Sequence, residues 1–171
     1  MLDFAQNHEK ELARKMRDTW GKEKYWYYHR CTYFSPAVVK EDTWNDTQFV
    51  SLNADKEVTG YLGYGIDREC RYVTYLAIIN FTGDISFGAD VMRMVKDIFE
   101  VYCYRKIVFT VVVGNPVEPK YDRLISRYGG RIVGIHKDHV MLPDGRLYDE
   151  KVYEIFRTDY LEHRKNVNNA E

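Results

Sequence analysis

The sequence lacks the features that mark several large classes of protein. Its 25 Lys and Arg residues nearly balance its 26 Asp and Glu residues, so a formal charge of −1 gives no electrostatic footprint for nucleic acid or an anionic membrane. No apolar run approaches the ~20 residues that cross a bilayer, and Met1–Lys10 has no signal-peptide pattern. We therefore expect a cytoplasmic protein that binds neither nucleic acid nor membranes.

Cysteine is scarce, and the common catalytic and metal motifs are missing. Cys31, Cys70 and Cys103 are odd in number and widely spaced, which fits neither a disulfide framework nor a metal knuckle, so we predict buried thiols. There is no Gly-x-Gly-x-x-Gly, Walker loop or nucleophile elbow. His136 and His139 lie three apart in a predicted strand, where we expect them to point to opposite faces. No metal site is therefore predicted.

Apolar and aromatic side chains, in contrast, are abundant. Hydrophobic residues make up 45% of the 171 residues and 15 residues are Tyr, which is ample apolar surface to offset the entropy of folding one domain. We predict a single domain over 1–171, with an amino-terminal part (1–47), a core (48–161) and a polar tail (162–171) that frays. The tyrosines gather within 25–33 and 61–75, where they either flank a substrate pocket or pack in the core.

The amino-terminal third of the sequence has less regular hydrophobic patterns than the rest of the chain. Periodicity predicts, in order, a helix over Asp3–Trp20, an aromatic strand over Lys24–Phe34, and a loop or short helix over Ser35–Asp46. Leu12, Met16 and Trp20 fall four apart, so we expect this stripe to pack on the body. The aromatic segment lacks clean alternation, which leaves a helix open for it.

The rest of the chain has clearer patterns. They predict strands over Gln48–Asn53, Val58–Asp67 and Tyr72–Ile79, a helix over Phe87–Tyr102, a strand over Ile107–Val113, a helix over Tyr121–Tyr128, and a hairpin from Gly130–Leu142 and Arg146–Phe156. The β-branched run Ile107–Val113 is typical of a strand buried on both faces, as a parallel crossover requires. This order predicts an α/β sandwich around a mixed sheet.

Three segments, in the correct order and at the correct spacing, carry a resemblance to a known family. They are Leu76-Ala77-Ile78, the loop Gly83-Asp84-Ile85-Ser86-Phe87-Gly88, and Asn115 directly after the Ile107–Val113 strand, followed by a closing hairpin from Gly129. Over about Gln48–Leu161 the chain resembles the GCN5-related N-acetyltransferase superfamily, and its hairpin resembles that of ribosomal-protein-type members. The resemblance implies an α/β (α+β) fold with a mostly antiparallel sheet of six to seven strands, helices on both faces and a central β-α-β crossover.

The resemblance also implies a binding site for acetyl-CoA. The backbone of Leu76, Ala77 and Ile78 would pair with the pantetheine arm, and the loop Gly83–Gly88 and Asn115 would bind the remainder of the cofactor. The loop departs from the family pattern, because Ser86 stands in place of the first glycine and Gly83 in place of a basic or amide residue. Asp84 would repel phosphates unless it caps the helix, and capping is the alternative role for Asp84 and Ser86.

The implied reaction is transfer of the acetyl group of acetyl-CoA to a primary amine, by direct attack in a ternary complex. The acceptor is an amine of a small molecule or of a protein. The family often places a Tyr seven residues after the Asn; that position is Asp122 here, and counting back from Gly129 gives Ile125. Tyr121 is the nearest phenol and the predicted acid, with a core aromatic as its alternative role.

The general base stays open at this level. Thr110 occupies the position where some members of the family carry a Glu, so a base would come from Glu57, Asp67, Glu118 or a water chain, or else the amine arrives already neutral. Because the loop Gly83–Gly88 departs from the family pattern, the alternative function is a non-catalytic binding or regulatory module on the same fold. A different acyl group and a homodimer also stay open.

Overall fold

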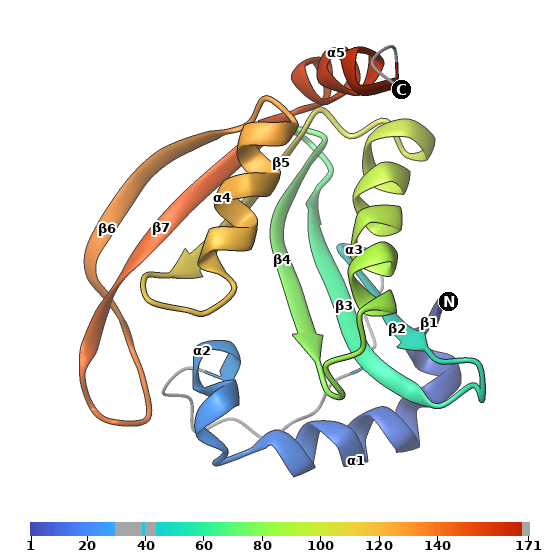
Figure 1. Cartoon of the computed structure of the whole chain (residues 1–171), viewed down its shortest axis with the longest axis vertical. Helices are drawn as coiled ribbons and strands as arrows, with labels where there is room; N and C mark the ends of the chain where they lie inside the picture. The colour runs from blue at the N-terminus through green and yellow to red at the C-terminus, as the bar shows by residue number, and fades with distance from the viewer. Residues whose placement is uncertain (30–38, 40–43, 169–171) are drawn as a thin grey trace.

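The computed structural model describes residues 1–29, 39 and 44–168, with helices on either side of a seven-stranded sheet (Figure 1). The order of strands across the sheet is β1-β2-β3-β4-β5-β7-β6. The strands are β1 (Leu2–Phe4), β2 (Asp46–Leu52), β3 (Val58–Asp67), β4 (Tyr72–Asn80), β5 (Lys106–Val112), β6 (Arg131–Met141) and β7 (Leu147–Phe156). All neighbours are antiparallel except β4 and β5, which are joined by the β-α-β crossover through α3. The predicted fold class is confirmed.

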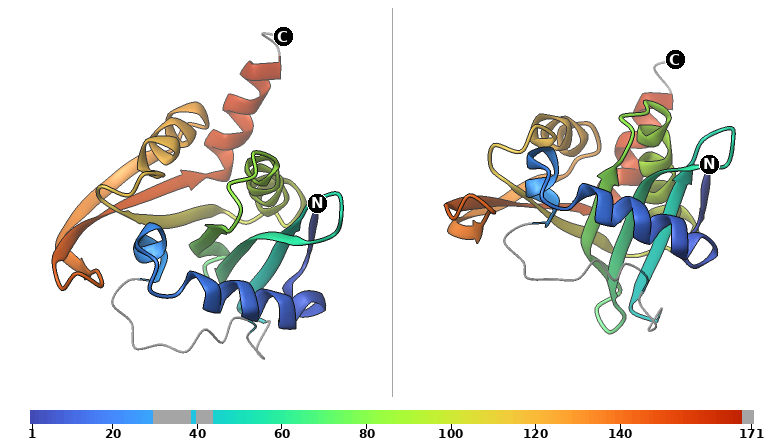
Figure 2. Two further views of the ribbon diagram at one scale, coloured as in Figure 1. Left: turned by 60° about the horizontal axis from the view of Figure 1, so that its bottom comes forward. Right: turned by 90° about the horizontal axis from the view of Figure 1, so that it is seen from below.

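The helices divide between the two faces of this sheet (Figure 2, left). One face carries α1 (Glu9–Thr19) and α2 (Trp26–His29), with the 3-10 turns η1 (Ala5–His8) and η2 (Glu23–Tyr25). The other face carries α3 (Ser86–Lys96), its π-helical continuation η3 (Asp97–Val101) and α4 (Glu118–Arg127), while α5 (Arg157–Asn168) follows β7. Alternate strand residues supply the two cores, since Leu62 and Phe109 pack under α3 and α4 whereas Val50 and Ile79 pack with Leu12 of α1.

The central predictions are confirmed by this arrangement. The β2–β3 pair, β4, the long helix, β5, α4 and the β6–β7 hairpin all lie within a few residues of their predicted bounds. Gly129 and Gly130 end α4 as expected, because Gly129 adopts a positive φ of 68° and the Gly130 N–H returns to the Ile125 carbonyl at 2.8 Å. β5 is less buried than predicted, since its Val108 and Thr110 face is only half-buried.

The amino-terminal predictions need correction. Leu2–Phe4 is a strand, because its backbone pairs with β2 and this tertiary pairing overrides the helical pattern of the segment. The segment predicted as a strand from Lys24 is helical as far as His29, since aromatic residues favour neither state strongly and α2 packs them on the sheet. Trp20 ends α1 in an extended conformation and is exposed, so it leaves the predicted stripe. Residues 30–38 and 40–43 lie outside the described residues.

The tail after Leu161 is helical as far as Asn168, where α5 ends, and the Tyr160 ring of this helix stacks on Phe99 with centroids 4.7 Å apart. The prediction of buried cysteines is wrong. Cys70 and Cys103 are exposed, since both lie in turns between elements, and Cys31 lies outside the described residues. None of the helices in the described part of the chain is long and apolar enough to span a membrane.

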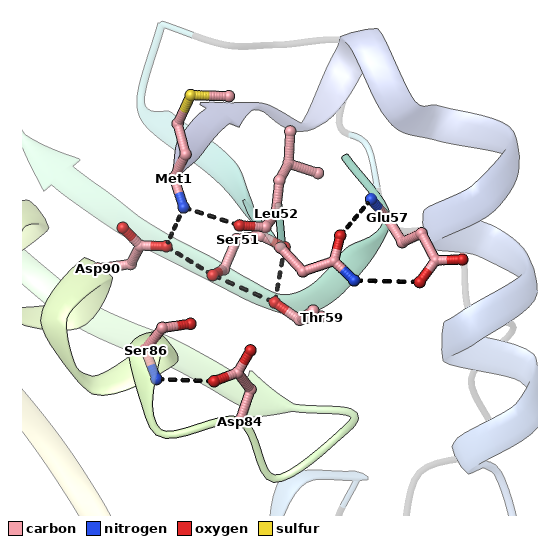
Figure 3. A network of polar contacts seen from close by, with 9 residues as sticks. Met1, Ser51, Leu52, Glu57, Thr59, Asp84, Ser86 and Asp90 are labelled. Carbon is pink, nitrogen blue, oxygen red and sulfur yellow. Dashed lines mark hydrogen bonds and ion pairs between the residues drawn. The ribbon is translucent and has the colours of Figure 1, made fainter. Parts of the chain in front are cut away.

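Asp90 fixes the position of α3 on the sheet (Figure 3). Its buried carboxylate accepts a hydrogen bond from the Ser51 hydroxyl of β2 at 2.6 Å and one from the amino group of Met1 at 3.0 Å. The Ser51 carbonyl in turn accepts a bond from the Thr59 hydroxyl of β3. A buried charge held by this many partners locates the start of α3, and with it the loop that precedes the helix.

Candidate functional site

The candidate site begins where β4 and β5 separate. In the described part of the chain a single ladder pair, Val73 with Ile107, joins these parallel strands, whereas β3 follows β4 on its other edge as far as Asn80. Beyond Val73 the two strands diverge (Figure 1). We call this splay, bounded by Tyr75–Asn80 and Val108–Val112, the β4–β5 wedge. The predicted residues Leu76, Ala77 and Ile78 lie on its β4 side, where the strand edge facing β5 has no ladder partner among the described residues.

Helices cover both faces of the wedge. On one face α2 spans it, because Tyr28 packs against the cluster that contains Ile79 of β4, and Tyr27 packs against Val112 of β5. Burial, with Tyr61 and Tyr75 nearby, raises the pKa of Tyr28, so this phenol stays protonated. On the other face lie α3 and α4. Within residues 1–29, 39 and 44–168, the wedge is therefore an open backbone edge between two helical covers.

The segment from Asn80 to Gly88 connects the last residue of β4 to the first turn of α3, and its side chains form hydrogen bonds with its own backbone. The Asn80 side chain accepts the N–H groups of Thr82 and Gly83 at 3.2 and 2.7 Å. The Asp84 carboxylate accepts the Ser86 N–H at 2.8 Å, at the start of α3 (Figure 3). Asp84 thus caps the helix, and this contact takes up a backbone donor that the family would present to a phosphate.

Two glycines of this loop have different roles. Gly83 has a φ of 79°, a conformation that other residues rarely adopt, so it is required by the turn itself. A Cβ added to Gly88 would meet nothing within 4 Å, so the backbone there is open to solvent or to a ligand. Among the described residues the N–H groups of Ile85 and Phe87 have no acceptor, and these are the donors that remain for an anion at the start of α3.

Asn115 follows β5 as predicted. Its side-chain oxygen accepts the Val117 N–H at 3.1 Å and its carbonyl accepts the Glu118 N–H at 2.8 Å. These bonds shape the turn into α4, which lies beside the wedge. The amide nitrogen of Asn115 makes no hydrogen bond to the described residues, so that end of the side chain is available to a ligand.

Tyr121 lies on α4 and packs on the sheet. Its ring meets Phe109 of β5 edge-on with centroids 5.3 Å apart, and Tyr153 of β7 lies beyond at 6.4 Å. Burial raises the pKa of Tyr121 to about 12, which keeps the phenol protonated at neutral pH. Its hydroxyl has no hydrogen-bond partner among the described residues, yet no side-chain oxygen among them is both fully buried and unpaired. The hydroxyl therefore keeps contact with solvent, and the packing and acid roles are compatible.

The three carboxylates considered as bases all have other partners. Glu57 lies in the exposed β2–β3 turn beside Asn53, and Asp67 accepts the Cys70 N–H at the closed end of the wedge. Glu118 forms an ion pair with Lys151 and accepts the Gly114 N–H. Asp122, on the same helix as Glu118, has a lowered pKa because it accepts a hydrogen bond from the Tyr153 hydroxyl and contacts Lys151.

Sequence reasoning missed a fourth carboxylate, Glu150 of β7. It is 4% exposed and its Oε1 accepts the Thr110 hydroxyl at 2.8 Å. Glu150 therefore lies beside the β5 position where some members of the family carry a Glu. Glu150 lies in the predicted hairpin, but its contact with Thr110 depends on the non-local pairing of β7 with β5, which only the sheet order reveals.

The histidines of β6 also differ from the prediction. The rings of His136 and His139 lie on the same side, with centroids 4.9 Å apart, because the register shifts between His136 and Val140 and Asp138 adopts a positive φ of 48°. From His136 to Val140 the chain of β6 advances four residues while β7 advances two, from Glu150 to Tyr148, so the irregularity breaks the alternation of the strand. Even so, the part of the chain that the structure describes contains no group of three His, Cys, Asp or Glu residues arranged to hold a metal ion.

Comparison with known proteins gives structural matches alone. No protein-family model and no curated protein matches the sequence. Solved structures do match: mutant forms of the spermidine/spermine N-acetyltransferase SpeG from Vibrio cholerae align over 72% of this chain and 71% of that one, at 23% identity and a TM-score of 0.61. A SpeG structure in complex with manganese ions aligns over 71% of both chains, at 22% identity and a TM-score of 0.59.

A chimera of SpeG from Vibrio cholerae and hSSAT gives a TM-score of 0.60 at 23% identity, with 71% of each chain covered. These matches show that the chain shares its fold with these N-acetyltransferases over about 71% of its length. The chain has the fold of the GCN5-related N-acetyltransferase superfamily.

Proposed function

We propose that this protein is an N-acetyltransferase that moves the acetyl group of acetyl-CoA to a primary amine by direct attack in a ternary complex. The observation that carries this proposal is the β4–β5 wedge, in which β4 leaves one backbone edge without a ladder partner in the described chain. An unpaired strand edge binds an extended amide chain by adding it as another strand. The pantetheine arm of acetyl-CoA is such a chain, and Leu76, Ala77 and Ile78 would hold it.

The start of α3 would receive the pyrophosphate. The N–H groups of Ile85 and Phe87, the open backbone at Gly88 and the positive end of the helix dipole favour an anion there. The carboxylate of Asp84 opposes it, since like charges at this range repel. The residues present therefore fit the pantetheine better than the phosphates, and we expect binding weaker than the fold could support.

The proposed reaction needs little acid catalysis. The lone pair of a neutral amine attacks the thioester carbonyl, a C–N bond forms and the C–S bond breaks. The nitrogen loses one proton to solvent, and the departing thiolate takes one proton from an acid that solvent then reprotonates. We assign that proton to the Tyr121 hydroxyl, which is protonated at neutral pH and touches solvent. Because a thiol of pKa ~8.5 is already a fair leaving group, the contribution of the acid is modest.

The acceptor that we propose is an aliphatic amine of the polyamine class. The proteins with similar structures are named as spermidine or spermidine/spermine N-acetyltransferases. On the α2 face of the wedge, the rings of Tyr27 and Tyr28 suit an alkylammonium group, because aromatic faces attract cations and the apolar ring edges pack on methylene chains.

Calorimetry and turnover test this proposal together. Acetyl-CoA is titrated into the full chain, and acetylation of spermidine is followed by release of free thiol. Binding with turnover supports an N-acetyltransferase. Absence of binding at millimolar acetyl-CoA would end the enzyme hypothesis.

A second function is favoured by one observation, the loop that binds its own backbone. Asn80 and Asp84 take up the N–H groups of Thr82, Gly83 and Ser86, so the phosphate cradle is partly filled by protein groups. A binding or regulatory module on this fold would need no cofactor and would tolerate such a loop. The same titration separates the two functions, because a module that has lost affinity for the cofactor binds no acetyl-CoA and transfers nothing.

A further inference from the structure

A cavity separate from the wedge lies beside α3, on the side of β1. Its volume is about 190 Å³, and it is lined by residues of β1, β2, β3 and the α3–η3 helix, with Tyr102 at the end of that helix. α3 stands between β1 and the wedge (Figure 1), and none of the described lining residues belongs to β4 or β5. The cavity is therefore distinct from the proposed acetyl-CoA site.

Aromatic rings form one side of this cavity. Phe4, Phe49 and Tyr64 come from three neighbouring strands, with ring centroids 5.4 Å apart for the first pair and 6.3 Å for the second. Met94 of α3 adds a buried apolar side chain to the lining. An apolar cavity of ~150 Å³ holds a benzene molecule, so this one has room for a ring or a branched apolar chain together with a few polar atoms.

Two opposite charges line the cavity from the helix. Arg93 and Asp97 are four residues apart, and the Asp97 N–H bonds to the Arg93 carbonyl, so the two side chains lie one turn apart on the same face. Neither side chain forms an ion pair or a hydrogen bond with the residues that the structure describes. Arg93 is exposed and Asp97 is half-buried, so both charges can be reached by a ligand.

The third charged group of the lining, Asp3 of β1, is bound by its own segment. Its Oδ1 accepts the Phe4 N–H at 2.8 Å and the Asn7 amide at 3.1 Å, and its Oδ2 lies 2.8 Å from Nε2 of His8. The contact with His8, and then the other two bonds, lower the pKa of Asp3. Asp3 thus holds β1 to η1, and one positive and one negative group remain for a ligand.

We propose that this cavity binds a small zwitterion, an α-amino acid with an apolar side chain. The guanidinium of Arg93 binds the carboxylate through paired N–H donors, Asp97 binds the ammonium, and the side chain packs on the rings of Phe4 and Phe49. Side chains four apart on a helix stand about 5–6 Å apart at Cβ, so the two charges of the ligand must be close together, as they are around an α-carbon. A polyamine does not fit, because Arg93 repels it.

Calorimetric titration of the full chain with L-phenylalanine and L-leucine tests the site. We expect saturable binding of at least one of them in the millimolar range or tighter. L-Phenylalaninamide lacks the carboxylate and 3-phenylpropionate lacks the ammonium, so each should bind about tenfold more weakly than L-phenylalanine, the size of one charge contact near a surface. No binding of either amino acid at tens of millimolar would overturn the proposal, and so would equal affinity for the amide and the free acid.

The variants Arg93→Gln and Asp97→Asn remove one charge each and should fold, because neither side chain has a described partner to lose. Each should lower the affinity for the amino acid about tenfold. Arg93→Gln should no longer distinguish L-phenylalanine from its amide, and Asp97→Asn should no longer distinguish it from 3-phenylpropionate. Unchanged affinity and selectivity in both variants would place the ligand elsewhere and overturn the proposal.

Lys96→Gln is the matched control, since Lys96 is exposed on the same helix but does not line the cavity. We expect its affinity for the amino acid to equal that of the unchanged protein. An equal loss in Lys96→Gln and Arg93→Gln would mean that net charge governs binding, which would also overturn the proposal. These titrations contain no acetyl-CoA, so their result stands whether or not the protein transfers acetyl groups.

Discussion

The edge of β4 and the loop that follows it are adjacent in sequence, yet they treat their backbone groups in opposite ways. Beyond Val73, the edge of β4 that faces β5 has no ladder partner in the part of the chain that the structure describes, whereas the loop after Asn80 binds its own N–H groups through Asn80 and Asp84. A strand edge offers the same donors and acceptors whatever its side chains are, so drift in sequence does not close it. A phosphate cradle depends on which N–H groups stay free, so one carboxylate is enough to alter it. In the proposed acetyl-CoA site, the contacts to pantetheine would thus depend on strand topology, and the contacts to the phosphates would depend on the side chains of the loop.

Gly88→Glu should produce the largest change, because it adds a second carboxylate at the start of α3. Repulsion between two like charges about 4 Å apart costs roughly 1 kcal/mol in water and roughly 4 kcal/mol near a protein surface. This cost corresponds to an increase of about ten- to a thousandfold in the Kd for acetyl-CoA. The fold should persist, since nothing lies within 4 Å of a Cβ at this position. Calorimetry measures the Kd, and Gly88→Ala is the control that adds bulk without charge. Unchanged affinity in Gly88→Glu would remove the loop from the site.

Tyr121→Phe tests whether the α4 face of the wedge takes part in chemistry. We expect kcat to fall about 10²-fold, the low end for an acid, because the phenol has a higher pKa than the thiolate it would protonate. The Kd for acetyl-CoA should be unchanged, because the ring still packs on Phe109. Tyr128→Phe is the control, since it removes a hydroxyl from the end of the same helix. Full activity in Tyr121→Phe would assign Tyr121 to packing alone.

Asp84→Asn should sharpen the comparison by restoring part of the phosphate half. An amide oxygen still caps the Ser86 N–H, but the charge that repels the cofactor is gone. We expect acetyl-CoA to bind about tenfold more tightly, a change of ~1.4 kcal/mol, within the range of one charge contact near a surface. The gain should decrease as salt is added, because screening weakens the repulsion in the unchanged protein. Weaker binding would mean that the carboxylate helps to shape the cradle.

The sequence predicts those parts of this site that local pattern controls. The β-branched run of β5 and the Gly129–Gly130 stop after α4 have the same meaning in any context, and both were predicted within a few residues. The segment from Lys24 was not, because its tyrosines suit a strand or a helix and packing on the sheet decides. Glu150 reaches Thr110 through pairing between strands 40 residues apart, which no local signal reports. The His136–His139 contact depends on the left-handed backbone of Asp138, a choice made by the bulge.

The smallest effect is expected when the ligand is changed and the protein is not. S-Acetylpantetheine keeps the amide chain for the β4 edge but has no phosphates for the loop. If Asp84 offsets most of the attraction of the α3 dipole, this fragment should bind within about tenfold of acetyl-CoA, since a helix terminus contributes only ~0.3–1 kcal/mol at an exposed site. Competition between the two compounds for the unchanged protein measures the ratio. In Asp84→Asn the ratio should widen in favour of acetyl-CoA, because removing the carboxylate helps only a ligand with phosphates. An equal ratio in both proteins would place the phosphates away from the loop, and the contrast between edge and loop would then have no bearing on binding.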